Sequence, residues 1–125
     1  ETEWEWAARG GKKSNGYKSA GSNNIDEVAW YNGNSSGKTH PVGIKKPNEL
    51  GIYDMSGNVW EWCQDYFHTD DYESSLREWP IKQYTGKSYG IRGGSWSDDL
   101  CLLTNRTWEF HDWRNYTIGF RLAKD

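Results

Sequence analysis

Two cysteines and three histidines are the side chains of this 125-residue chain best suited to redox or metal chemistry. Cys63 and Cys101 are too few for a disulfide scaffold or for a structural zinc site built from cysteine. They are compatible with one bridge or with two buried thiols, because a sequence does not supply the geometry of a disulfide. His40, His68 and His111 lie far apart without the spacing of metal ligands, so they predict no metal centre.

Large aromatic side chains stand among small polar ones in the segment 97–117. Aromatic rings supply rigid contact area and small polar side chains supply adaptable hydrogen bonds, and the mixture is typical of a binding surface. We therefore predict that this segment binds a ligand. The predicted contact residues are Asp98, Asp99, Asn105, Thr107, Trp108, Phe110, His111, Trp113, Asn115 and Tyr116.

The rings of this segment could instead form the core of an ordinary domain. Trp108, Phe110 and Trp113 are spaced by two and three residues in a polar segment without strand alternation. That pattern favours exposure of most of them. Leu102 and Leu103 are better candidates for a buried strand here.

The elements that position these residues are expected to be short, because the composition is polar and rich in glycine. Leu, Ile, Val and Phe are scarce, but nine Trp and eight Tyr can bury large areas, so we expect one folded domain with an aromatic core. Fourteen Gly indicate tight turns. A net charge of −3 without a basic face argues against binding of nucleic acid. No apolar run is long enough for this chain to insert into a membrane.

Helix signals occur twice in the first part of the chain. Residues 2–9 predict a short helix with Thr2 as its N-cap, acidic residues in the first turn and glycine after its end. Residues 25–31 predict a short helical turn capped by Asn24 or Asn23.

Strand signals occur in three places. Residues 59–67 are rich in Val, Trp, Tyr and Phe, which favour strands. Residues 89–92 precede a tight turn at a glycine pair, and residues 118–123 alternate between apolar and small or polar side chains. Most of the segment 97–117 is predicted to be irregular.

Four sequence motifs stand in order along the chain: EWEWAARGG at 3–11, GIYDMSGNVWEW at 51–62, IRGGSW at 91–96 and GFR at 119–121. They resemble the motifs of the formylglycine-generating-enzyme, or sulfatase-modifying-factor, family. The resemblance covers residues 1–125 as a single domain and matches the later half of the family's usual domain. It implies an α+β fold of the C-type lectin-like type, with short strands, few helices and much irregular loop.

Members of that family that oxidise a substrate cysteine place two reactive cysteines shortly after the GGS motif. Residues 97–103 of this chain contain one, Cys101, with Asp or Leu where the rest of that site would stand. A lone thiol does not supply paired thiolate chemistry or soft-metal ligation. The resemblance therefore implies a member that is not an enzyme and requires no cofactor. The alternative is a formylglycine-generating oxidoreductase that acts on a peptide cysteine.

The family's YDxxGNVWE turn can hold calcium through an acidic or amide side chain, two backbone carbonyls and a glutamate. The matching positions in this chain are Asp54, Gly57, Val59 and Glu61, which would offer the hard oxygen ligands that calcium prefers. In the alternative interpretation, Asp54 caps the turn and Glu61 pairs with an arginine. The sequence leaves both interpretations open.

The stretch that ends in IGFR also resembles the variable proteins of diversity-generating retroelements, although the spacing from Trp96 to Cys101 is shorter than usual. Arg106 and Arg114 match invariant arginines of that stretch. With Arg121, we expect them to hold loops through carboxylates and carbonyls. The resemblance implies a diversified surface, extracellular or at the cell surface, that binds a protein or other macromolecular ligand. A structural subunit is a further option.

Overall fold

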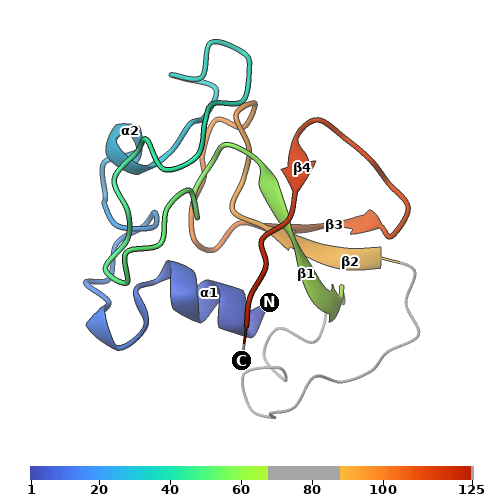
Figure 1. The fold of residues 1–125 in the computed structure, drawn as a ribbon, viewed down its shortest axis with the longest axis horizontal. Helices are drawn as coiled ribbons and strands as arrows, with labels where there is room; N and C mark the ends of the chain where they lie inside the picture. Colours follow the sequence, from blue (N-terminus) through green and yellow to red (C-terminus); the bar gives the residue numbers. More distant parts are fainter. Residues whose placement is uncertain (68–87, 125) are drawn as a thin grey trace.

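The computed structural model describes residues 1–67 and 88–124, and His68 lies outside them. Short helices and strands are joined by long loops (Figure 1), which confirms the predicted α+β fold. No helix in the described part of the chain is long and apolar enough to cross a membrane. The elements in chain order are α1 (Thr2–Ala8), the 3-10 helix η1 (Gly11–Lys13), α2 (Ile25–Val28), β1 (Trp60–Tyr66), β2 (Ser88–Arg92), β3 (Arg106–Phe110) and β4 (Ile118–Gly119).

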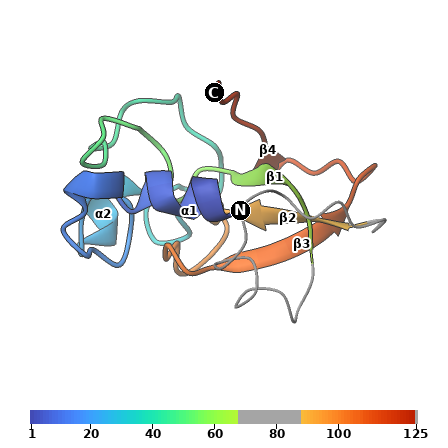
Figure 2. The ribbon, with the colours of Figure 1, turned by 90° about the horizontal axis from the view of Figure 1, so that it is seen from below.

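One sheet contains these four strands in the order β3-β2-β1-β4. β2 pairs antiparallel with both β1 and β3, whereas β4 pairs parallel with β1. The connection from β3 to β4 therefore runs from one edge of the sheet to the other (Figure 1). Figure 2 shows that the N-terminal end of α1 meets the sheet beside β2.

Alternation along the strands gives the sheet two faces. Glu61, Arg92 and Arg106 lie in register across three strands and contact side chains of Glu1 or α1, so we call this side the helix face. The opposite side carries Trp62. We call it the loop face, because residues of the β3–β4 connection line cavities with Trp62 there.

Helix α1 forms as predicted, but the predicted N-cap is wrong. Glu1 occupies the N-cap position without a side-chain cap hydrogen bond, and Thr2 is already helical. Gly10, with a φ of 88°, follows the helix and turns the chain in a conformation that side chains disfavour. In α2 the predicted cap is confirmed, since the Asn24 side chain accepts a hydrogen bond from the Asp26 amide at 3.2 Å.

The segment 97–117 is more regular than predicted, because β3 occupies its middle. Leu103 is buried at 2% exposure, but Leu102 and Leu103 lie in a turn before β3, so the strand predicted at this pair is wrong. The terminal strand is shorter than predicted and ends at Gly119. Phe120 and Leu122 are 75% and 88% exposed, so no core contact extends the strand.

Small side chains build the core, and the prediction of an aromatic core is wrong. None of the fully buried hydrophobic residues in the described ranges is aromatic. Trp4 instead lies at the margin of the core, where its indole N–H can reach a partner. Trp4 packs against the first cluster and donates to the Glu61 carboxylate at 2.8 Å. The two buried clusters are Ala8, Ala20, Met55 and Leu103, and Val28, Ala29 and Cys101.

Arg92 of β2 is fully buried and joins α1 to the sheet. Its guanidinium pairs with Glu1 at 3.2 Å, pairs with Glu5 and donates to the Leu103 carbonyl at 2.7 Å. Glu1 also accepts two hydrogen bonds from Arg106 at the start of β3. A buried charge is tolerated only when it is paired and hydrogen-bonded, so this network fixes α1, β2 and β3 relative to one another.

Replacement of Arg92 by alanine should lower the free energy of unfolding by about 3–5 kcal/mol, because it removes the buried cation that Glu1 and Glu5 share. Urea unfolding followed by circular dichroism measures this loss. Arg9→Ala is the matched control, since Arg9 pairs with Glu5 from a side chain that is 40% exposed and should cost less than about 1 kcal/mol. Equal losses in the two variants would contradict a central role for Arg92.

Candidate ligand-binding site

Strand β3 places Arg106, Trp108 and Phe110 of the predicted segment on the helix face. Trp108 and Phe110 contact each other edge to face, with ring centroids 5.4 Å apart. Phe67, at the end of β1, lies 6.4 Å from Trp108 and beneath the Arg106 guanidinium at 4.5 Å. Phe67, Arg106, Trp108 and Phe110 therefore form one cluster of three rings and a guanidinium, which we call the β3 cluster.

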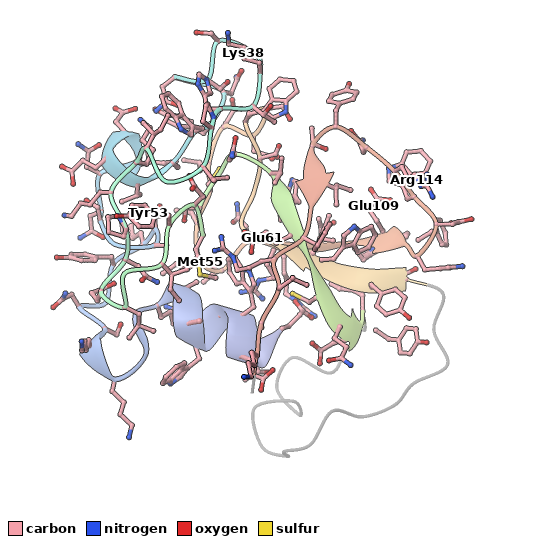
Figure 3. The ribbon with its side chains drawn as sticks, in the orientation of Figure 1. Lys38, Tyr53, Met55, Glu61, Glu109 and Arg114 are labelled. Atoms are coloured by element: carbon pink, nitrogen blue, oxygen red, sulfur yellow. The ribbon has the colours of Figure 1, made fainter. Side chains whose placement is uncertain are left out.

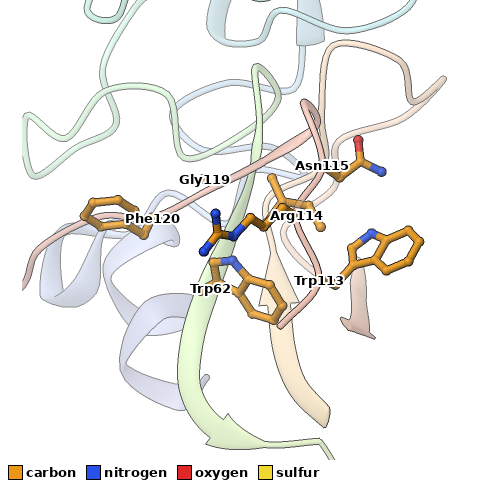
Figure 4. Close-up of a pocket in the computed structure, with 7 residues that line it drawn as sticks. Trp62, Trp113, Arg114, Asn115, Gly119 and Phe120 are labelled. Carbon is orange, nitrogen blue, oxygen red and sulfur yellow. The ribbon is translucent and has the colours of Figure 1, made fainter. Parts of the chain in front are cut away.

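The connection 111–117 lies over the loop face of the sheet. A groove of about 150 Å³, which we call the Trp62 groove, opens between this connection and β1 (Figure 4). A second cavity of about 340 Å³ is lined by Trp62, Cys63, Tyr89 and His111. The Trp62 groove is lined by Trp62, Trp113, Arg114, Asn115, Ile118, Gly119 and Phe120.

Tyr116 lies apart from both of these places. Its ring stacks on Trp96 with centroids 5.9 Å apart, and its carbonyl accepts a hydrogen bond from the Trp96 indole at 3.4 Å. Tyr116 remains 78% exposed. The stack fixes the direction of a ring that still faces solvent.

Exposure of the rings agrees with the predicted binding segment. Trp108, Phe110 and Trp113 are 42%, 47% and 50% exposed, so the interpretation of these rings as core residues is wrong. Each ring nevertheless lies against another side chain or lines a groove, so the exposed faces are held in place. Rigid, half-exposed aromatic side chains lose little conformational entropy when a ligand covers them.

The polar residues at the start of the segment lie elsewhere. The Asp98 carboxylate accepts hydrogen bonds from the Trp60 indole at 2.9 Å and from the Ser95 amide at 2.8 Å. The Asn105 amide group donates to the Leu100 carbonyl at 2.9 Å. The side chains of Asp98 and Asn105 thus stabilise the loop that follows β2. Asp99 similarly accepts from Asn32 at 2.9 Å.

The ten predicted contact residues therefore do not form one surface. Thr107 is on the loop-face side of β3, whereas Trp108 and Phe110 belong to the helix face. His111, Trp113 and Asn115 line the cavities on the loop face. The side chains that the structure brings together come from the β3 cluster and from the connection 111–117.

Four residues of the Trp62 groove were missed by the sequence analysis, namely Trp62, Ile118, Gly119 and Phe120, and one, Arg114, was given a different role. Trp62 was assigned only to a strand, although strand alternation with the inward-facing Glu61 would have placed it on the other face. Phe120 was predicted to lie within the terminal strand 118–123. Arg114 was expected to hold a loop, but within the described ranges it forms no ion pair or hydrogen bond. For Arg106 and Arg121 the expectation is confirmed.

In the predicted calcium turn, Glu61 pairs with an arginine, as in the alternative interpretation, and Asp54 binds a neighbouring loop. Asp54, with a φ of 57°, accepts a hydrogen bond from the Gly43 amide at 2.7 Å. Glu61, at the centre of Figure 3, binds the Arg121 guanidinium at 2.7 Å, and this hydrogen bond raises the pKa of Arg121. The Arg121 guanidinium thus pairs with one of the four predicted calcium ligands, and the calcium site at Asp54, Gly57, Val59 and Glu61 stays a prediction. No group of three or more His, Cys, Asp or Glu side chains in the described ranges is arranged for a metal.

Both cysteines are free and buried, so the structure contains no bridge between them. Burial raises the pKa of the Cys63 thiol to about 11 and that of the Cys101 thiol to about 12. Cys101 is fully buried and its thiol faces the Ser95 carbonyl at 3.6 Å. Gly94 is required beside it, since a Cβ at that position would lie 2.8 Å from the Cys101 sulfur. Such thiols are packing residues and not reactive thiolates.

A family profile described as "Sulfatase-modifying factor enzyme 1-like domain" matches residues 1–125. The chain belongs to this family. The variable protein 1 of Treponema denticola has a similar structure, with a TM-score of 0.77 and 39% identity over 94% of this chain and 43% of that one. The formylglycine-generating enzyme of Streptomyces coelicolor is 33% identical over 100% of this chain and 45% of its own length. A serine/threonine-protein kinase, Pkn1, of Chlamydia trachomatis is 40% identical over 100% of this chain and 20% of its own length.

This family member thus spans less than half the length of each of these three proteins. The relatives include enzymes and a variable protein, so membership alone does not assign an activity. The function must therefore be inferred from the side chains of the β3 cluster, the Trp62 groove and the cysteines.

The two thiols should be unreactive toward Ellman's reagent at pH 8 in the folded protein and should both react in urea, because burial holds them protonated. Their ordinary pKa is 9.0, so the unfolded chain ionises first as the pH rises. Their contribution to stability is complete below about pH 9 and is lost as the pH rises toward 11 to 12. Rapid labelling of Cys101 in the folded state would contradict its assignment to the core.

Asp98 and Asp99 should respond differently to substitution. Asp98→Ala removes the acceptor of the Trp60 and Ser95 hydrogen bonds and should cost about 1–3 kcal/mol of folding free energy. Asp99→Ala is the neighbouring control and should stay within about 0.5 kcal/mol of the parent chain. Thermal and urea unfolding measure both. A stable Asp98→Ala variant would show that Asp98 is free to contact a ligand.

Proposed function

We propose that this chain is a non-catalytic binding domain that holds a protein or other macromolecular ligand on the β3 cluster and the connection 111–117. The observation that carries the proposal is the set of half-exposed rings, from 42% at Trp108 to 78% at Tyr116, each held by a neighbouring side chain or groove wall. Similarity to a solved variable protein along 94% of the chain supports it. We further propose that the surface is displayed outside the cell.

Both ends of the binding segment are fixed by ion pairs of the core. Arg106, at the start of β3, binds Glu1, and Arg121, just after β4, binds Glu61. Between these anchors the backbone pairs with β2 over the whole of β3 and with β1 at Ile118. A surface that is ordered before binding loses less entropy on binding, which raises affinity without added contacts.

The oxidoreductase alternative finds little support in the arrangement of the thiols. Cys101 is the only cysteine of the loop after the GGS motif, it is fully buried, and burial raises its pKa to about 12. A redox-active cysteine needs an accessible thiolate. Cys63 belongs to β1, and the structure forms no disulfide between the two.

Peptides selected from a phage-displayed random library on the immobilised chain should bind through the proposed surface. For a selected peptide, Trp113→Ala and Trp108→Ala should each raise the dissociation constant roughly tenfold or more, as is usual for exposed aromatic hot spots. Isothermal titration calorimetry measures this. Trp6→Ala is the matched control, because Trp6 is 54% exposed on α1, outside the surface. Affinity that depends on Trp6 and not on Trp108 or Trp113 would overturn the proposal.

A second measurement addresses the alternative directly. The chain is incubated with a cysteine-containing peptide, copper(I) or iron(II), oxygen and a reducing agent, and the peptide is analysed by mass spectrometry. We expect the peptide mass to stay unchanged. Conversion of the peptide cysteine to the aldehyde, lost in Cys101→Ala, would establish the oxidoreductase instead.

A further inference from the structure

The Trp62 groove is small and has aromatic walls that come from three parts of the chain. Trp62 belongs to β1, Trp113 to the β3–β4 connection, and Phe120 follows β4. Its volume of about 150 Å³ is well below the roughly 300–1,000 Å³ of pockets for small molecules. The groove therefore suits a single side chain that projects from a larger ligand.

Arg114 gives the groove a positive charge that no described side chain neutralises. The guanidinium is exposed and forms no hydrogen bond or ion pair with any described residue. Glu109 and Asp112 are the nearest acidic residues along the chain, and neither reaches it as an ion-pair partner. In contrast, Arg92, Arg106 and Arg121 are each neutralised by a carboxylate of the fold.

Aromatic residues of the groove flank this guanidinium. Figure 4 shows Arg114 projecting across the ring of Trp62 toward Phe120, with Asn115 and Trp113 on the other side of the groove. A planar guanidinium carries its hydrogen-bond donors in a fixed fork. A carboxylate accepts two parallel hydrogen bonds from that fork.

We propose that the Trp62 groove binds the carboxylate of an acidic side chain of a protein ligand through Arg114, while Trp113 and Trp62 contact the apolar stem of that side chain or its neighbour. The inference rests on the proposed binding function and assigns part of the chemistry of the partner. The size of the groove favours one Asp or Glu side chain over an extended polyanion. The net charge of −3 also disfavours a polyanion, because the chain as a whole repels a highly negative ligand.

Matched peptides test the proposal on the full chain. The first peptide is acetyl-Gly-Leu-Glu-Leu-Gly-amide, and the second carries Gln in place of Glu. Binding is measured from the indole N–H signals in proton–nitrogen NMR spectra, with Trp62→Phe and Trp113→Phe used to identify the two signals. We expect the Glu peptide to shift both signals and to bind roughly tenfold more tightly than the Gln peptide, as a charge-assisted hydrogen bond predicts.

Variants of the arginine locate the effect. Arg114→Gln should abolish the preference for Glu, and Arg114→Lys should keep only part of it, because lysine supplies the charge without the fork. Lys38→Gln removes one positive charge on a distant loop (Figure 3) and should leave the preference unchanged. Arg114 has no partner among the described residues, so Arg114→Gln should also unfold at the temperature of the parent chain.

Three results would overturn the proposal: equal binding of the two peptides, an unchanged preference in Arg114→Gln, or an equal loss of preference in Lys38→Gln. A third peptide, with Gln inside and a free C-terminal carboxylate, tests the source of the acid. Tight binding of that peptide alone would replace the side-chain carboxylate by a chain end and overturn the assignment. None of these results alters the dependence of selected peptides on Trp108, so the inference and the proposed function can fail separately.

Discussion

The buried guanidinium of Arg92 determines how the rest of the molecule is arranged. It has no access to solvent, and its partners come from the chain end before α1, from α1 itself and from the loop that leads into β3. Through Glu1 the same network reaches Arg106, where the binding segment begins. An ion pair of this kind adds little net stability compared with an apolar core, but it admits few alternative arrangements. The network thus fixes α1 and the start of β3 relative to β2, while small side chains fill the two buried clusters.

Structural and contact roles are divided between neighbouring positions of the same strands. On β1, Glu61 points to the helix face and binds Arg121, while Trp62 points to the loop face and forms the floor of a groove. On β3, Arg106 binds Glu1, while Trp108 two residues later remains half-exposed. Each of these two strands thus contributes an ion pair of the frame and a side chain of the proposed binding surface. The positions that face solvent can change without breaking an ion pair of the frame.

Sequence motifs predicted the family, the α+β fold and the exposure of the rings, because these follow from local patterns. Strand β3 was not predicted, because Trp108, Glu109 and Phe110 alternate for only one period in a polar segment, which is too short a pattern to indicate a strand. The roles of Asp98 and Asp99 could not be separated, because adjacent residues of one type differ only in their tertiary partners. For the same reason, motif matches could not distinguish Arg114, which has no partner among the described residues, from the paired arginines.

The β3–β4 connection starts at one edge of the sheet and ends at the other, and both ends are pinned by strand pairing and by buried carboxylates. Its middle passes over the loop face and carries no ladder hydrogen bond of its own. The entropic cost of lengthening such a span is small, about 0.6 kcal/mol for each doubling. Insertions here would change how far the chain reaches from the sheet while leaving the ladder intact. The architecture therefore tolerates variation in loop length as well as in side-chain identity, and related domains could present shallow or protruding surfaces from the same scaffold.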